Sequence, residues 1–429
     1  MRRPPSRAGL AIGPAAFPLV RPASPAGRGS SFARIACSRS MASAIVAFAI
    51  FAGSAARVLP ALLAVTVQQD LGLQPSDVSL PITLGIAVSA CVSPFAAYSL
   101  ERWGVRAPLI VSLALLALSL ASTTHAMSPW HLTVVWGLGV GFSGSLSASL
   151  LGAMVGSRGG AAHCGTRFGL LASMQPLGSA AGLLLASRAA SALDWRFAFQ
   201  AAAVGVLATA FAVVLVPISR RGALPRGPKS NRHGTSRLKE ENWRFWVLAT
   251  TFCICGASTS GLIDGQLGML CMGAGLGLTS SADVMAILVL GGAVGSVVSG
   301  ILADRCPART LLALYFVVRA LLLLWLPFTG FSVVELARFG ALYGLDAALT
   351  FPALVRLMSV NLGALRVGRA MGWMTVMHLA GGAIASAAIG ALGLAAYAVG
   401  FAGVGLACLA AAGLVVLLKD APAQDASSG

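Results

Sequence analysis

Apolar segments of about 20 residues recur along the whole chain and are separated by short polar segments. A helix of that length crosses the roughly 30 Å hydrocarbon layer of a membrane, so each apolar segment is predicted to be a transmembrane helix. The pattern predicts an all-α membrane protein with twelve spans. They lie near residues 43–66, 79–99, 108–126, 131–156, 167–187, 197–217, 245–263, 282–302, 310–327, 334–358, 370–392 and 395–417.

Two short charged loops occupy equivalent places in the two halves of this pattern. Residues 101–106 join spans two and three, and residues 304–309 join spans eight and nine. The loops begin 203 positions apart, at residues 101 and 304, in a chain of 429 residues. The chain is therefore interpreted as an internal duplication of six helices. A duplicated helical bundle in a membrane is typical of two-lobed secondary transporters.

The distribution of positive charge predicts how the chain is oriented and divided. Lys and Arg favour cytoplasmic loops, and placing both termini and alternate loops in the cytoplasm collects 25 of the 30 basic residues there. The predicted domains are a disordered basic tail (1–40), an N-terminal six-helix lobe (41–217), a cytoplasmic linker (218–243), a C-terminal six-helix lobe (244–418) and a short C-terminal tail (419–429).

The start of the chain leaves several interpretations open, because Met41 stands directly before the first apolar span. Residues 1–40 hold seven arginines and no acidic residue. They are interpreted as an upstream extension that function does not need. The alternatives are a basic tail lying on anionic lipid and an organellar transit peptide.

Composition supports the membrane class and excludes others. Hydrophobic residues make up 57% of the chain, charged residues 10%, and the mean hydropathy is +0.85. The net charge of +17 follows the predicted topology, so nucleic-acid binding is not expected, and lipid headgroups are the expected partners of the basic loops. We expect free cysteines, no metal, no cofactor and a monomer in the cytoplasmic membrane. An enzyme is not expected either, because the common hydrolase, metalloprotease and nucleotide-binding motifs are absent.

The charged loops resemble a motif of the major facilitator superfamily, and the resemblance extends over residues 41–418. The family pattern is Gly-x-x-x-Asp-Arg-x-Gly-x-Arg. Ala97 in the first copy and Pro307 in the second depart from it, and Glu101 supplies the carboxylate of the first copy. A carboxylate at a helix end can pair with arginines and with the N-terminus of a neighbouring helix. The loop side chains are therefore expected to form latches that hold one conformation: Glu101, Arg102, Arg106, Asp304, Arg305 and Arg309.

Within that superfamily, two segments are similar to the bacterial branch related to monocarboxylate and oxalate:formate transporters. They are residues 343–352 and 372–381. Leu379 and Gln266 depart from the residues common in that branch, which leaves the substrate open. The proline motif of drug:proton antiporters is missing from span five. The resemblance implies a carrier that moves a small organic anion, expected to be a monocarboxylate, by alternating access.

Ionisable residues inside spans are the strongest candidates for chemistry, because a charge at the bilayer centre costs at least roughly 2.5–3.5 kcal/mol. Arg57 in span one is predicted to hold a substrate carboxylate through two parallel hydrogen bonds. Its alternatives are an interhelical ion pair and a snorkelling side chain. His378 in span eleven is predicted to bind substrate and take up a proton, and Asp346 in span ten to carry a proton. Their alternatives are a neutral core histidine and pairing of Asp346 with Arg338.

Other polar residues in the spans complete the candidate site. Gln175 and Thr375 are predicted to line the pocket, although they are equally consistent with packing. Asp264 is consistent with a gate, an entry site or a solvated helix end, and Arg319 with structural pairing or snorkelling. The overall hypothesis is proton-coupled transport of a small organic anion. The alternatives are an efflux carrier for drugs or neutral metabolites and, remotely, a membrane-embedded enzyme.

Overall fold

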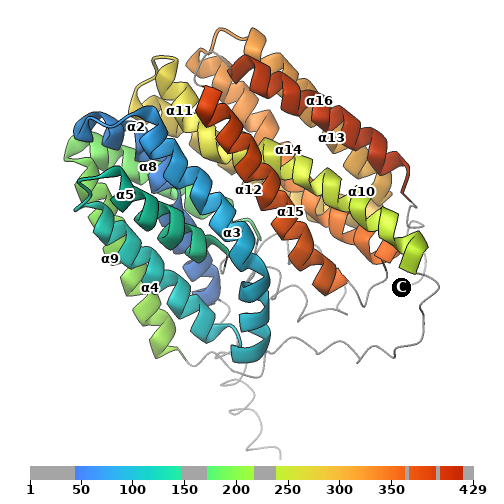
Figure 1. Cartoon of the computed structure of the whole chain (residues 1–429), viewed down its shortest axis with the longest axis horizontal. Helices are drawn as coiled ribbons and strands as arrows, with labels where there is room; N and C mark the ends of the chain where they lie inside the picture. The colour runs from blue at the N-terminus through green and yellow to red at the C-terminus, as the bar shows by residue number, and fades with distance from the viewer. Residues whose placement is uncertain (1–43, 146–171, 217–237, 363–366, 393–396, 419–429) are drawn as a thin grey trace, which may run out of the picture. The chain divides into compact units, whose positions relative to one another are not determined.

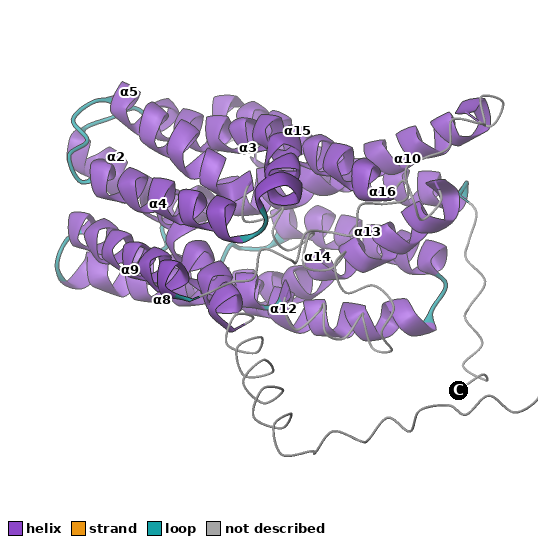
Figure 2. Cartoon of the chain, turned by 90° about the horizontal axis from the view of Figure 1, so that it is seen from below, coloured by secondary structure: helices purple, strands orange, loops and turns teal. Residues whose placement is uncertain are grey.

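The computed structural model describes residues 44–145, 172–216, 238–362, 367–392 and 397–418. Within these ranges the regular secondary structure is entirely helical, as Figure 2 shows. Residues from Ala44 onward form one compact unit. The predicted tails and most of the predicted linker lie outside the described ranges, so the domain boundaries remain predictions.

The first half of the chain begins with a span at Ala44–Leu71, and the second part of that span is the helix α2. The described helices of this half follow in sequence, and residues 146–171, between η2 and α8, lie outside the described ranges. They are α2 (Leu59–Leu71), α3 (Pro75–Trp103), α4 (Arg106–Thr123), α5 (Pro129–Leu132), the π-helix η2 (Thr133–Val140), α8 (Met174–Ala192) and α9 (Trp195–Leu215).

The second half repeats this organisation with a longer set of described helices. A π-helix interrupts its first span, and a short 3-10 helix follows its third. The elements are α10 (Leu238–Gly256), the π-helix η4 (Ala257–Asp264), α11 (Gly265–Gly273), α12 (Leu278–Arg305), α13 (Ala308–Trp325), η5 (Leu326–Phe328), α14 (Val333–Leu362), α15 (Val367–Leu392) and α16 (Tyr397–Val416).

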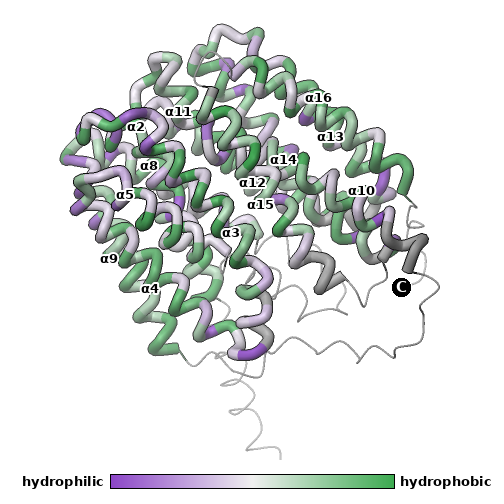
Figure 3. Tube along the Cα trace, in the orientation of Figure 1, coloured by the Kyte–Doolittle hydropathy of each residue, from purple (hydrophilic) through white to green (hydrophobic). Residues whose placement is uncertain are grey.

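Ten helical segments in the described ranges are long and apolar enough to cross a membrane. They coincide with ten of the predicted spans, which confirms a multi-pass membrane protein. The remaining two predicted spans, 131–156 and 167–187, overlap residues outside the described ranges, so the number twelve stays a prediction. Figure 3 shows hydrophobic residues along most of the helix length and hydrophilic residues gathered mainly near helix ends, as a lipid environment requires.

Helices of the two halves group separately and meet through a few pairs (Figure 1). The most extensive contacts between halves join α3 with α15 and α12 with α8. In the predicted numbering these are spans two and eleven, and spans eight and five. The two pairs are exchanged when one half is superimposed on the other in sequence order, so the interface itself has the symmetry expected of a duplication.

Small residues allow the helices to approach closely. Gly178 and Gly182 on α8 face the backbone of the first span, where a methyl group would collide with the carbonyl oxygens of Phe51 and Ala55. Lipid supplies no hydrophobic force between helices, so such backbone contacts stabilise the bundle by packing. Replacement of either glycine would force α8 away from the first span.

The two charged loops have different backbones. Gly104 adopts a positive φ of 75°, a conformation that residues with a side chain rarely adopt, and this turn joins α3 to α4. The second loop reaches α13 through Pro307, whose φ of −61° and ψ of 124° are extended. With proline in place of glycine, the second loop therefore forms a different turn from the first.

Polar contacts between the halves in the described ranges lie toward the end of the bundle predicted to face outward. Arg188 at the end of α8 pairs with Asp283 of α12 at 3.1 Å. The hydroxyl groups of Thr83 on α3 and Ser386 on α15 are 2.9 Å apart. These contacts hold the two halves together at that end.

The predicted orientation can be tested by chemical labelling. In a background without native cysteines, single cysteines at Ser230 and Gly363 are expected to react with an impermeant reagent only from the cytoplasm, and a cysteine at Gln69 only from outside, because Lys and Arg favour cytoplasmic loops. The measurement is maleimide labelling of right-side-out and inverted vesicles. Reaction of the Gln69 position from the cytoplasmic side would reverse the orientation.

Candidate functional site

Arg57 lies within the first membrane span and is half-buried. Its guanidinium donates hydrogen bonds to the Ser54 hydroxyl at 2.9 Å and to the Gly144 carbonyl oxygen at 3.3 Å. No carboxylate of the described residues lies within ion-pair distance of it. The structure therefore places a positive charge inside the membrane with neutral partners only. That arrangement leaves donor capacity and charge for an anion.

The surroundings of Arg57 are polar and small. The Ser89 hydroxyl of α3 donates to the Gly141 carbonyl oxygen at 2.6 Å, and the Ser145 hydroxyl donates to the Ser89 carbonyl oxygen at 2.7 Å. Both serines satisfy backbone groups near the guanidinium and thereby hold α3 against the fourth predicted span.

A second buried arginine has a full ionic partner. The Arg319 Nε on α13 lies 2.8 Å from Asp346 Oδ2 on α14, and both side chains are almost completely buried. Arg319 also lies over the rings of Phe316 and Tyr343, at 5.6 Å and 5.7 Å from the ring centres. Asp346 thus pairs with Arg319 and not with Arg338. Desolvation of a paired charge is tolerable because attraction between the partners offsets it.

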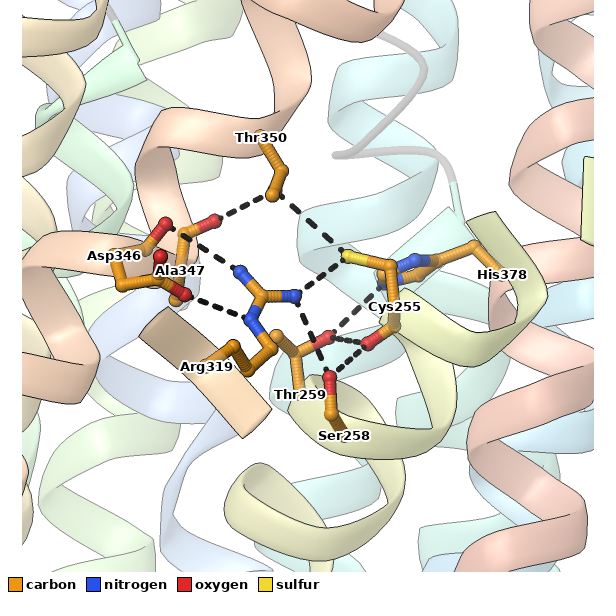
Figure 4. Close-up of polar contacts among 8 residues, drawn as sticks. All are labelled: Cys255, Ser258, Thr259, Arg319, Asp346, Ala347, Thr350 and His378. Atoms are coloured by element: carbon orange, nitrogen blue, oxygen red, sulfur yellow. Dashed lines mark hydrogen bonds and ion pairs between the residues drawn. The ribbon is translucent and has the colours of Figure 1, made fainter. Parts of the chain in front are cut away.

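The Arg319 guanidinium also connects this pair to the seventh predicted span (Figure 4). It donates to the Cys255 sulfur at 3.0 Å and to the Ser258 hydroxyl at 3.4 Å. In Figure 4 it lies between Asp346 on one side and these two residues on the other. The pair therefore joins α13, α14 and the junction of α10 with η4. Its contacts are those of a clamp within the second half.

His378 on α15 faces the same junction from another side. Its Nδ1 lies 3.3 Å from the Phe252 carbonyl oxygen, and its Nε2 lies 3.2 Å from the Ser260 hydroxyl and 3.5 Å from the Thr259 hydroxyl. Its ring packs on the Phe252 ring at 4.5 Å. His378 reaches Asp346 only through intervening groups, namely Thr259, Cys255 and Arg319 (Figure 4).

The π-helix η4 is the element that brings these groups together. Its sequence is rich in small and hydroxyl residues, and both Ser258 and Thr259 donate side-chain hydrogen bonds to the Cys255 carbonyl oxygen at 2.8 Å. Such local bonds compete with the regular helical ladder, and π-helical turns frequently occur at functional sites. The close approach of Gly256 to the His378 backbone then fixes α15 against this segment.

Asp264 is the last residue of η4, and its side chain is exposed although protein atoms surround it within a predicted membrane span. We interpret this combination of accessibility and surrounding protein atoms as a side chain that faces a space between helices, called the opening below. Among the described residues its carboxylate has no hydrogen bond or ion pair, and it interacts electrostatically with His378. The following residue, Gly265, faces Ile86 of α3 in the other half of the chain.

The other predicted pocket residues are less informative. Gln175 is exposed near the start of α8, and Thr375 on α15 is half-buried and has an interaction partner. The hydrogen bonds described above connect neither of them to Arg57 or His378. The structure therefore brings His378 and Asp346 into one polar network. It keeps Arg57 in the other half of the chain.

The loop arginines bind within their own halves. Arg106 donates to the carbonyl oxygen of Val214 near the end of α9, and Arg309 donates to that of Leu418 just beyond α16. These are equivalent contacts in the two halves, and each supplies a cation to exposed carbonyls at the end of the last helix. Arg102 donates to the Tyr98 hydroxyl at 3.0 Å. The expected latches remain predictions, because the side chains of Glu101, Asp304 and Arg305 lie outside the described part.

The described residues contain no cluster of three or more His, Cys, Asp or Glu side chains that could hold a metal ion. Cys255 accepts a hydrogen bond from Arg319, and Cys253 belongs to no group of possible metal ligands among the described residues. Sequence reasoning did not recognise the Arg319–Asp346 pair, because the two residues are on different helices. The sequence did show that each of them is a charged residue within a predicted span, which is rare in membrane helices.

Comparison with known proteins agrees with this architecture. No curated protein matches the chain. The sequence profile described as Major Facilitator Superfamily matches residues 42–282, which is more than half of the chain and spans the first half, the linker and the start of the second half. Members of this family are transporters rather than enzymes. With its paired halves and its membrane-spanning helices, this chain belongs to the Major Facilitator Superfamily.

Proposed function

We propose that the chain is a secondary transporter that moves a small organic anion, of the monocarboxylate class, across the cytoplasmic membrane by alternating access. The single observation that carries this proposal is the Arg57 guanidinium. It is a charge within a membrane span that has two neutral acceptors and no carboxylate partner among the described residues. A carboxylate ligand would supply the missing counter-charge and accept two parallel hydrogen bonds.

The contrast with Arg319 strengthens this assignment. Arg319 has its own buried carboxylate, Asp346, at 2.8 Å, so its charge is already compensated. A substrate anion gains little there, because it would have to displace an existing ion pair in a buried site. The two arginines therefore have separate roles: Arg57 receives the anion, and Arg319 organises the second half.

We further propose that transport is coupled to protons through the polar groups of the second half. An anion that crosses with a proton adds no net charge to the membrane interior, which avoids the desolvation cost of an unpaired charge. His378 is suitable for proton exchange because imidazole ionises near neutral pH. It lies against η4 and interacts with the accessible Asp264.

Transport by purified protein in liposomes tests this function. Labelled formate, acetate, lactate, pyruvate and oxalate are offered with an inward proton gradient and without one. Uptake of at least one monocarboxylate, with accumulation only when the gradient is present, is the expected result. With one proton per anion, a gradient of one pH unit supports up to about tenfold accumulation. Transport of neutral or cationic drugs in place of carboxylates would favour an efflux carrier and overturn the proposal.

A further inference from the structure

Two unpaired opposite charges lie in membrane spans of the two halves: Arg57 in the first span and Asp264 in the seventh. Neither has an ion pair among the described residues. Two other acidic residues of the described membrane spans have basic partners. Asp346 pairs with Arg319, and Asp283 pairs with Arg188. An uncompensated carboxylate in a membrane span is costly unless its charge is balanced or a proton neutralises it.

Contacts between the two spans place Arg57 and Asp264 at the same level. Gly268 on α11 approaches the Ala61 backbone, since a methyl group on the glycine would lie 3.3 Å from the Ala61 carbonyl oxygen. Asp264 precedes Gly268 by four residues, and Arg57 precedes Ala61 by four residues. Residues four apart in a helix lie one turn from each other on one face, which holds for Asp264 and Gly268 at the start of α11. A turn at Val58 separates Arg57 from α2, but Val58 keeps right-handed helical angles, so Arg57 also lies about one turn from Ala61. Both charges therefore lie one turn from the same contact, on the same side of it.

The helix α3 provides a second connection between them. The Ile86 side chain lies 3.7 Å from where a methyl group on Gly265 would be, directly beside Asp264. Ser89, one turn further along α3, lies beside Gly144, which accepts a hydrogen bond from Arg57. One face of α3 thus passes from the neighbourhood of Asp264 to that of Arg57 within about one helical turn, or roughly 5 Å of rise.

We propose that Asp264 is the group that carries the coupled proton. Asp264 is the counter-charge of Arg57 in the empty carrier, and the substrate anion takes over that role when it binds. In the empty carrier the Asp264 carboxylate balances the Arg57 guanidinium across the opening. When a substrate carboxylate pairs with Arg57, a proton from the aqueous side binds an Asp264 carboxylate oxygen. The charge in the opening is then the same in the empty and loaded carrier, and both ligands leave together on the other side.

His378 is a neighbour of this proton site. It interacts electrostatically with Asp264 and bonds to Ser260 within η4. Among the described residues, the other titratable or charged groups near η4 are the thiols Cys253 and Cys255 on α10 and Cys408 on α16. Arg319 on α13 and Tyr343 on α14 also face Ser258 of η4. Asp346 has a different role in this proposal, because Arg319 already compensates it.

The test compares Asp264→Asn with wild type in proteoliposomes, using the carboxylate of the panel above that wild type takes up best. The variant is expected to lose accumulation driven by a one-unit pH gradient, from up to about tenfold in wild type to none. Exchange of labelled for unlabelled carboxylate without a gradient is expected to survive, because a neutral amide leaves Arg57 available. Asp264→Glu is expected to retain accumulation, and Asp194→Asn at the start of α9 is the matched control.

The outcomes separate this inference from the proposed function, on which it rests. If wild type exchanges no carboxylate, the proposed function itself fails. If wild type accumulates the anion and Asp264→Asn does so equally, this inference alone is overturned. It is also overturned if the inserted Asp264→Asn protein loses exchange together with accumulation, since Asp264 would then bind the substrate directly. Proton uptake recorded by a trapped pH dye on anion addition is expected in wild type and absent in Asp264→Asn.

Discussion

Replacing Arg57 with alanine is expected to weaken binding of the substrate anion by about 100-fold. A hydrogen bond to a charged group contributes roughly 1.5–3 kcal/mol, and every 1.4 kcal/mol changes affinity about tenfold. Arg57 has only the Ser54 hydroxyl and the Gly144 carbonyl oxygen as described partners, so the substitution breaks no described ion pair. The loss is therefore expected in affinity rather than in folding.

Arg57→Lys is expected to fall between wild type and Arg57→Ala, because lysine keeps the charge but cannot form two parallel hydrogen bonds with a carboxylate. The measurement is the substrate concentration at half-maximal exchange in proteoliposomes at equal protein content. Arg338→Ala on α14 is the control, since that arginine is exposed. Equal affinity in wild type and Arg57→Ala would remove Arg57 from the site and favour a carrier for neutral compounds.

The fold could be predicted from the sequence because lipid imposes simple requirements. Apolar segments of membrane length indicated the spans, and ten of them are confirmed in the described residues. The charged loops indicated the duplication. In the structure, Arg106 and Arg309 of these loops make equivalent contacts with the ends of α9 and α16. These features depend on local sequence and on helix length, which one sequence is enough to show.

The site could be predicted only in part, because ion pairs depend on which helices meet. The cost of a buried charge indicated Arg57, Arg319, Asp346 and His378, but the sequence does not show that α13 and α14 bring Arg319 and Asp346 together. Asp264 was placed near a helix end from the hydropathy pattern. The structure extends that span to Gly273 through η4 and α11, so Asp264 lies well inside it. Irregular helical turns of this kind have no strong sequence signal.

The buried pair of Arg319 and Asp346 supplies the largest expected effect on stability. Arg319→Met removes the only described ionic partner of Asp346, whose side chain is 3% exposed, and leaves a buried carboxylate uncompensated. Breaking one side of such a pair costs roughly 3–5 kcal/mol. Asp346→Asn leaves Arg319 in the corresponding position, although Cys255 and Ser258 still accept its hydrogen bonds. Both single variants are therefore expected to unfold at clearly lower temperature in detergent.

The double variant Arg319→Met with Asp346→Leu is expected to recover most of the lost stability, because replacing both charges with apolar groups of similar volume removes the desolvation cost as well as the attraction. Thermal unfolding of purified protein measures this recovery, and transport by the same protein then decides what Asp346 does. A stable double variant that still accumulates the anion with a pH gradient identifies the pair as a clamp joining α13, α14 and η4. A stable double variant that exchanges the anion but no longer accumulates it would assign proton transfer to Asp346 and remove that role from Asp264.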